Sequence, residues 1–323
     1  MFKNLTFYLF GESWSAPEGQ ALQDLQELLS LRQFTPIQPT SEKSVGWAPP
    51  RKTEGEAFLE ISGHNWLLRL VVERKNVPSG AVSAEVQRLQ REREEAEGAK
   101  LSRKEVRALK DEAYMNLLPK AFAKKAEVMV WLDMANRRVI FDSTSTSLVD
   151  EAITQLSQLL HDAGSPLALM AWSPLTPLED VMGLWLSEQN FPEGFEPDEY
   201  LEMRSGGEDL ASVRYSRHNL EIDEVVEHIR QGKRVLELGL AWQERTSFHL
   251  CANGSLKKVA LLIDVFEDTD ESFDADVVLY TEELSQLLNA LTGVLGHSAT
   301  GAGGTDSPTS GADDTAAPDA VAG

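Results

Sequence analysis

The 323-residue sequence contains one cysteine and no long apolar run. Because Cys251 has no second cysteine to pair with, an intramolecular disulfide is excluded and a reducing compartment is expected. No stretch approaches the roughly 18–20 apolar residues that span a bilayer. The first residues also lack the long apolar region of a secretory signal. We therefore expect a cytoplasmic protein without a membrane segment.

Spacings that assemble common active sites and cofactor sites are also missing. None of the six histidines has another at i+3 or i+4, and a single cysteine offers no zinc-binding spacing. Gly232-Lys233 lacks the upstream glycine of a phosphate-binding loop. The stretch from Asp264 to Asp276 lacks the glycine and ligand alternation of a calcium loop, and we interpret it as a solvated acidic loop. We predict no cofactor, no metal and no enzymatic activity.

One short segment is similar to a catalytic motif. Gly11-Glu12-Ser13-Trp14-Ser15 follows an apolar strand pattern, as a nucleophile elbow does. It lacks the final glycine that the tight strand-to-helix turn requires. We interpret Trp14 and Ser15 as turn and cap residues, with a serine hydrolase that uses Ser13 as the alternative.

Acidic and basic residues are unevenly distributed along the chain. The total of 52 Asp+Glu against 30 Lys+Arg gives a formal charge of -22. Between Leu67 and Arg138, however, 16 Lys+Arg stand against 11 Asp+Glu. Phosphate binding requires Lys and Arg, so the negative net charge of the whole chain argues against a nucleic-acid ligand. The local excess of Lys and Arg between Leu67 and Arg138 permits one. A solvated, salt-bridged helix in an acidic protein would give the same pattern.

The periodicity of apolar residues predicts an α+β fold with mostly antiparallel sheets. In the first half we expect strands at Leu5–Phe10 and Asn65–Glu73 and a β-hairpin over Glu127–Asp142. Val45–Lys52 is interpreted as a proline-interrupted loop, and a helix is expected from Ser147 to Leu160.

The second half has a similar order of elements. Strands are expected at residues 200–203, 212–215, 234–242, 246–251, 256–265 and 276–280, with helices at 222–230 and 282–295. A helix, a hairpin and a helix thus follow one another around residues 102–162 and again around 222–292. This order suggests two similar halves.

The segment from Ser79 to Met115 is highly polar and helical in pattern. Gly98 interrupts it, and the capping-box spacing of Ser102 and Glu105 restarts a helix. We predict that residues 77–125 form a projecting helical arm. Residues 1–76 and 126–296 would form the body, and residues 297–323, which are poor in large apolar side chains, a disordered acidic tail.

Three sites combine basic residues with a nearby aromatic or helix end. Lys120, Lys124 and Lys125 surround Phe122. Arg214 and Arg217 flank Tyr215, and Lys233-Arg234 follows the next predicted helix. Such side chains contact phosphates and stack on bases, and no groove-reading motif accompanies them. They predict binding to the DNA backbone with little sequence preference.

Short segments in a fixed order resemble the recombination-associated RdgC family from Phe2 to about Leu295. The segments are FKNL, GW-PP (Gly46, Trp47, Pro49, Pro50), LKDE, LLPKAF, MVWLD, HIRQGK, LAWQER, NGSLKK and FDADVVL.

The resemblance implies a cytoplasmic, nucleoid-associated protein that forms a ring-shaped homodimer around DNA. Such a protein binds single- and double-stranded DNA nonspecifically and restrains the recombinase RecA. The resemblance assigns Phe122 to one of the two dimer contacts and Lys120 to the basic position two residues before it. It also places Arg217, with Arg214 beside it, before the HIRQGK helix. A ring can be acidic outside and basic within. The alternative is a protein-interaction scaffold that acts on recombination proteins without touching DNA.

Overall fold

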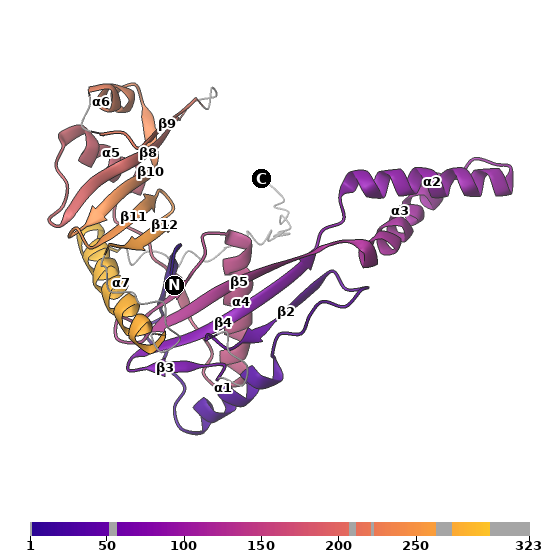
Figure 1. The fold of residues 1–323 in the computed structure, drawn as a ribbon, viewed down its shortest axis with the longest axis horizontal. Coiled ribbons are helices and arrows are strands. Elements are labelled where there is room, and N and C mark those ends of the chain that lie inside the picture. Colours follow the sequence, from indigo (N-terminus) through magenta and orange to yellow (C-terminus); the bar gives the residue numbers. More distant parts are fainter. Residues whose placement is uncertain (1, 52–56, 207–210, 221–222, 263–272, 298–323) are drawn as a thin grey trace, which may run out of the picture.

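The computed structural model describes residues 2–51, 57–206, 211–220, 223–262 and 273–297. Figure 1 shows two lobes, each built on a β-sheet, and a helical hairpin that extends from one end of the first sheet. Adjacent strands within the two sheets pair antiparallel throughout the described residues. The predicted α+β class with antiparallel sheets is confirmed.

The first lobe contains a seven-stranded sheet with the order β2-β4-β5-β6-β1-β7, in which β3 also pairs with β4. Its strands are β1 (Thr6–Phe10), β2 (Lys43–Ala48), β3 (Glu60–Ser62), β4 (Asn65–Lys75), β5 (Ala123–Asp133), β6 (Arg138–Phe141) and β7 (Leu169–Ala171). Helices α1 (Gln20–Leu31) and α4 (Thr146–Asp162) cover one face. Alternate residues of β4 and β5, such as Leu70 and Val130, pack against them.

The second lobe contains a five-stranded sheet with the order β12-β11-β10-β8-β9. Its strands are β8 (Phe195–Ser205), β9 (Ser212–Ser216), β10 (Lys233–Trp242), β11 (Thr246–Cys251) and β12 (Leu256–Leu261). Its helices are α5 (Leu178–Glu188), α6 (Asp223–Arg230) and α7 (Phe273–Leu295). Apolar residues of all three helices, such as Met182, Val225 and Leu288, share one core with this sheet.

The two lobes are joined through the N-terminal segment and a shared core. Leu5 exchanges two backbone hydrogen bonds with Leu256, of 2.7 and 2.8 Å, just before β1 and at the start of β12. Leu67 and Trp131, on the face of the first sheet opposite α1 and α4, belong to the same apolar cluster as the second lobe. The lobes therefore pack as one body.

The helical hairpin consists of α2 (Ser79–Glu97) and α3 (Arg103–Leu117), and a 3-10 turn (η1, Leu118–Lys120) leads from it into β5. Gly98 ends α2 in a left-handed conformation, with φ of 67°. The Ser102 side chain and the Glu105 backbone and side chain form the predicted capping box at the start of α3. The hairpin extends beyond the paired ends of β4 and β5 (Figure 1).

Two predicted elements are wrong. The segment interpreted as a loop from Val45 contains β2, because residues 43–48 pair along the whole of residues 69–74 and Pro49 follows only after the strand ends. The strand predicted at residues 276–280 is part of α7, where Val277, Leu284 and Leu288 are buried at helical spacing. Most of the acidic stretch at Asp264–Asp276 and the chain after His297 lie outside the described residues.

Candidate nucleic-acid interface

The end of the first sheet that adjoins the helical hairpin gathers basic side chains from three strands. Lys43 lies opposite Arg74, and Arg74 lies opposite Lys124 on its other side. Because residues paired in register point to the same face, these three form one cross-strand row. We call the basic residues at this end the strand-end cluster: Lys43, Arg74, Lys75, Lys120, Lys124 and Lys125.

Most of the strand-end cluster is held by partners within the protein. Lys43 and Arg74 both contact Glu151 of α4, with Arg74 at 3.1 Å. Lys75 donates from Nζ to two backbone carbonyl oxygens, at 2.6 and 3.2 Å. Lys125 lies 3.3 Å from Glu127, and its ammonium group stands 5.3 Å from the centre of the Phe34 ring. These contacts fix the positions of four of the cations.

Lys120 and Lys124 differ from their neighbours. Both are exposed, and neither has a carboxylate within ion-pair distance in the part of the chain that the structure describes. The charge of Lys120 contributes to a lowered pKa of Glu85, although the hydrogen bond from Arg88 is the main cause of that shift. These two ammonium groups are therefore the ones open to an anionic ligand at this end of the sheet.

Phe122 lies between these two lysines with 94% of its surface exposed. A large apolar side chain in this position gains nothing from the hydrophobic effect within one chain. The exposure follows from its place, since Phe122 lies with Ala121 in the two-residue link between the η1 turn and the first residue of β5. Phe122 is thus a candidate for a contact that a single chain does not provide.

The other predicted basic residues lie in the second lobe. Arg214, on β9, donates to Glu202 at 2.8 Å, and Arg234, on β10, donates to Glu179 at 2.7 Å. Lys233 lies 2.9 Å from the Nδ1 atom of His228. Arg217 follows β9 with a left-handed φ of 55°, an uncommon conformation for a residue with a side chain. Two of these four cations are therefore already paired with carboxylates.

The aromatic ring between Arg214 and Arg217 is partly buried. Tyr215 packs against the core of the second lobe, and its ring lies 5.8 Å from that of His218 and 6.5 Å from that of His228. Burial is the main cause of a raised pKa for its phenol. The Tyr215 ring is therefore only partly accessible to a stacking base.

The predicted basic residues form two separate sets in one chain. Figure 1 shows β9, α6 and the start of β10 in the second lobe, at the opposite end of the molecule from the helical hairpin. The basic residues predicted from the sequence do not include Lys43, Arg74 and Lys75. The register of β2, β4 and β5 brings them beside Lys124, and only the length of the apolar strand before Arg74 could have indicated their place.

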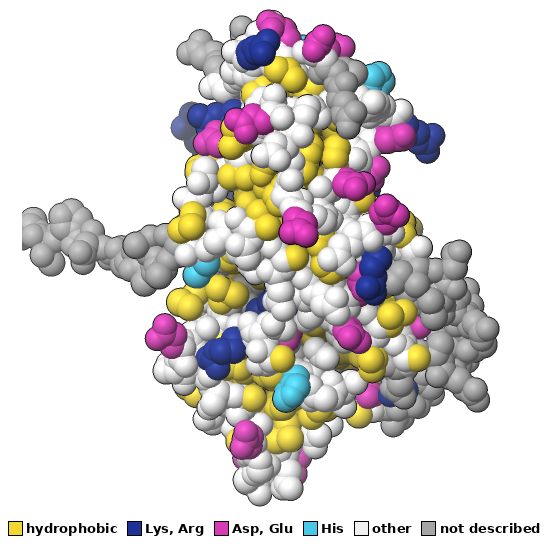
Figure 2. Space-filling view, turned by 90° about the vertical axis from the view of Figure 1, so that its left-hand side faces the viewer, with side chains coloured by type: hydrophobic (Ala, Val, Ile, Leu, Met, Phe, Trp, Pro, Cys, Tyr) yellow, Lys and Arg dark blue, Asp and Glu magenta, His cyan; other side chains and the backbone are white. Residues whose placement is uncertain are grey.

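The face away from the helical hairpin has a different charge pattern. Figure 2 shows acidic side chains scattered over both lobes on this face, while its Lys and Arg side chains lie apart from one another. Among the described residues, no helix is both long and apolar enough to cross a membrane. The described ranges also hold no group of three or more His, Cys, Asp or Glu side chains placed to bind a metal ion.

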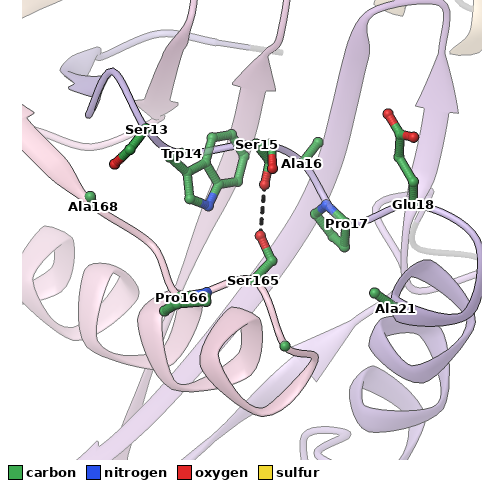
Figure 3. Close-up of a pocket in the computed structure, with 11 residues that line it drawn as sticks. Ser13, Trp14, Ser15, Ala16, Pro17, Glu18, Ala21, Ser165, Pro166 and Ala168 are labelled. Atoms are coloured by element: carbon green, nitrogen blue, oxygen red, sulfur yellow. Dashed lines mark hydrogen bonds between the residues drawn. The ribbon is translucent and has the colours of Figure 1, made fainter.

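A pocket of about 360 Å³ adjoins Ser13. Figure 3 shows that the segments around Ser15 and Ser165 line it, and the Ser165 hydroxyl donates to the Ser15 carbonyl oxygen at 2.7 Å. No histidine is among the described residues that line the pocket, and Glu18 is their one carboxylate. The lining therefore places no imidazole beside Ser13 to act as a base.

These features define a class of protein: a two-lobed α+β chain in which a polar helical hairpin extends from a basic strand end. Residues 1–298 match the family model described as "Putative exonuclease, RdgC". The chain is 35% identical over 304 residues to the recombination-associated protein RdgC of Cupriavidus pinatubonensis, which covers 91% of this chain and 98% of that protein. It is 33% identical over 302 residues to the protein of the same name from a Janthinobacterium strain, covering 91% and 97%. The chain belongs to the RdgC family, a family of recombination-associated proteins.

Proposed function

We propose that this protein binds single- and double-stranded DNA without sequence preference. The observation that carries the proposal is that the ammonium groups of Lys120 and Lys124, in the strand-end cluster, are exposed and have no carboxylate within ion-pair distance among the described residues. Cations that are not neutralised by carboxylates can replace the counterions of a DNA backbone. The proposed contacts also include Lys125 and, in the second lobe, Arg214, Arg217, Lys233 and Arg234.

We propose further that two copies form a closed ring around the DNA. Phe122, 94% exposed beside the proposed phosphate contacts, would pack against the second copy. In an isologous dimer the same patch meets itself, so one exposed aromatic per chain is enough for a contact. The two sets of cations lie at opposite ends of one chain (Figure 1), and we propose that both face the DNA inside the ring.

In the cell the protein would be cytoplasmic and nucleoid-associated. Its binding to DNA would modulate RecA-dependent recombination. Both relatives described above are named recombination-associated proteins. A protein that coats or encircles DNA competes with the RecA filament for the same backbone. We propose that the protein acts by occupancy and not by hydrolysis, so an end-labelled duplex incubated with it and Mg²⁺ should stay intact.

The test of DNA binding is a salt titration with unrelated duplex and single-stranded sequences. The logarithm of the binding constant should fall linearly with the logarithm of salt concentration, with similar affinities for all sequences. The mass of the complex, measured by light scattering on the same samples, should correspond to two protein chains and one DNA molecule. Binding that is absent at low salt, or that does not change with salt, would refute the proposal.

A scaffold that contacts recombination proteins without touching DNA is the second candidate. It is favoured by the ion pairs of Arg214 with Glu202 and of Arg234 with Glu179, which neutralise predicted DNA contacts. Capture of RecA by the immobilised protein after nuclease treatment, together with no binding in the salt titration, would support the scaffold.

A further inference from the structure

The C-terminal end of α7 is held against the residues that follow β7. The Trp172 Nε1 atom donates to the Gly296 carbonyl oxygen at 3.2 Å. The Ser173 backbone N–H donates to the Nδ1 atom of His297 at 3.3 Å. His297 is the last residue that the structure describes, so the point from which residues 298–323 start is fixed to the body.

The charged side chains of residues 298–323, which we call the C-terminal segment, are all acidic. The segment contains no Lys, Arg or Glu, and its aspartates are Asp306, Asp313, Asp314 and Asp319. The match to the family model stops at residue 298, so almost all of the segment lies beyond the part of the chain that the family shares. The segment is thus an acidic addition to the fold described above.

The strand-end cluster lies within reach of the C-terminal segment. His297 and Arg138 line the same pocket of about 360 Å³, and Arg138 lies opposite Asp133 at the end of β5. From Asp133 to Lys124 the strand β5 rises about 30 Å. Asp313 follows His297 by 16 residues, and an extended chain of that length spans as much as ~50 Å. The segment can therefore bring carboxylates to the far end of the first sheet.

Lys120 and Lys124 are the cations best suited to receive these carboxylates. Both are exposed, and neither has a carboxylate within ion-pair distance among the described residues. In the second lobe, by contrast, Arg214 and Arg234 are already paired with carboxylates, at 2.8 and 2.7 Å. A carboxylate that binds the two lysines gains an ion pair without breaking another one.

We propose that the C-terminal segment binds back onto the strand-end cluster, where its aspartates contact Lys120 and Lys124 and compete with DNA. Carboxylates and phosphates both bind ammonium groups through charge-assisted hydrogen bonds, so the two ligands exclude each other at the same lysines. The segment thereby limits DNA binding at this end of the protein. This inference rests on the proposed DNA-binding function.

Such a contact is strong enough to compete and weak enough to be displaced. Exposed ion pairs each contribute little, and salt screens them. Attachment to the same chain gives the segment an effective concentration on the order of millimolar at the cluster. DNA carries a much denser row of negative charge, and its binding also releases counterions, so it displaces the segment. The effect of the segment on DNA binding is therefore largest at low salt.

The test compares two full-length variants that each lose four carboxylates. The segment variant carries Asp306→Asn, Asp313→Asn, Asp314→Asn and Asp319→Asn. The control changes four glutamates that are exposed on the body and make no ion pair among the described residues, through Glu12→Gln, Glu27→Gln, Glu188→Gln and Glu196→Gln. The segment variant should bind a duplex several-fold more tightly than the wild type at low salt, and the two affinities should converge as salt is raised. An equal gain in the control would show that net charge sets the affinity, which overturns the proposal.

The lysines that the segment contacts are identified by a double-mutant cycle. In a chain that carries Lys120→Gln and Lys124→Gln, the four changes of the segment variant should leave DNA affinity unchanged, because the proposed partners of the aspartates are gone. A gain as large as in the wild-type background would overturn the assignment of the segment to these two lysines.

A measurement without DNA separates this proposal from the proposed function. A carbodiimide joins a carboxylate and an ammonium group that are in contact through an amide bond, with loss of water. In the wild type at low salt, proteolysis and mass spectrometry should find the C-terminal segment linked to Lys120 or Lys124, and high salt should reduce these links. Links to other lysines only, or no links, would overturn the proposal even if DNA binds. The expected links in a wild type that binds no DNA would support the contact and refute the proposed function.

Discussion

Arg138 and Asp133 form a buried ion pair across the turn between β5 and β6, and α7 attaches to the first lobe at this pair. The Arg138 Nε atom donates to Asp133 Oδ2 at 2.9 Å, and the two side chains are 3% and 1% exposed. The Ser285 hydroxyl donates to the same carboxylate oxygen at 2.6 Å, and Arg138 donates to the Ser285 carbonyl oxygen at 3.0 Å. Asn289 accepts a further hydrogen bond from Arg138.

Replacing Arg138 should therefore destabilise the whole body. Arg138→Ala leaves Asp133 buried without its partner, and breaking a buried pair in this way costs about 3–5 kcal/mol. Urea unfolding followed by tryptophan fluorescence measures the change. Arg230→Ala, which removes an exposed arginine of α6, is the control and should change stability by no more than about 0.5 kcal/mol. Similar midpoints for the two variants would contradict a structural role for the pair.

Elements that depend on residues close together in the chain could be predicted from the sequence. The hairpin over Glu127–Asp142, the break at Gly98 and the capping box of Ser102 with Glu105 each depend on residues close together in the chain, and each is confirmed. The strand β2 depends instead on a distant contact. Gly46 lies against the backbone of Phe34, and a Cβ atom there would come within 2.5 Å of it.

The candidate site shows the same division between local and distant information. That α3 would end near Pro119 and leave Phe122 exposed could be predicted, because proline has no backbone N–H to continue the helical hydrogen bonds. That Lys43 and Arg74 lie beside Lys124 could not, since it depends on the register of strands more than thirty residues apart in sequence. The short apolar run at residues 276–280 was interpreted as a strand, although it lies in α7. A run of this length does not distinguish a strand from a helix.

Replacing Phe122 should weaken the proposed dimer. Truncation of a buried interface aromatic commonly costs about 2 kcal/mol or more, so Phe122→Ala should raise the dimer dissociation constant at least tenfold and lower DNA affinity indirectly. Sedimentation over a concentration series measures the first effect. Leu31→Ala is the matched control, because Leu31 is also apolar and 81% exposed but lies at the end of α1. An unchanged dimer with unchanged DNA binding in Phe122→Ala would remove Phe122 from the interface.

Removing Lys120 and Lys124 should reduce the salt dependence of DNA binding. Lys120→Gln with Lys124→Gln should lower the slope of log K against log salt by about 2, and by the same amount for every sequence, because phosphate contacts carry no sequence information. The control is Arg32→Gln with Arg51→Gln, which removes two cations that pair with Asp162 and Glu60. If the control lowers the slope as much as the lysine variant, net charge and not a local contact sets the affinity.

The Glu237 carboxylate should make stability depend on pH on the acid side. Burial alone would raise its pKa, but hydrogen bonds from Lys257 and His249, at 2.6 and 2.8 Å, outweigh burial and hold the pKa below its usual value of 4.5. A pKa that is lower in the folded than in the unfolded state stabilises the fold above about pH 4.5, and this contribution is lost as the pH falls through the folded value.

Glu237→Gln should consequently be less stable than the wild type at pH 7, and the difference should shrink as the pH is lowered below about 4.5. Urea unfolding midpoints measured between neutral and acidic pH determine this difference. Glu12→Gln serves as the control, because Glu12 is exposed and makes no ion pair within the described chain. Its difference from the wild type should stay near zero throughout. A Glu237→Gln difference that is constant with pH would show that the carboxylate contributes through packing and not through its charge.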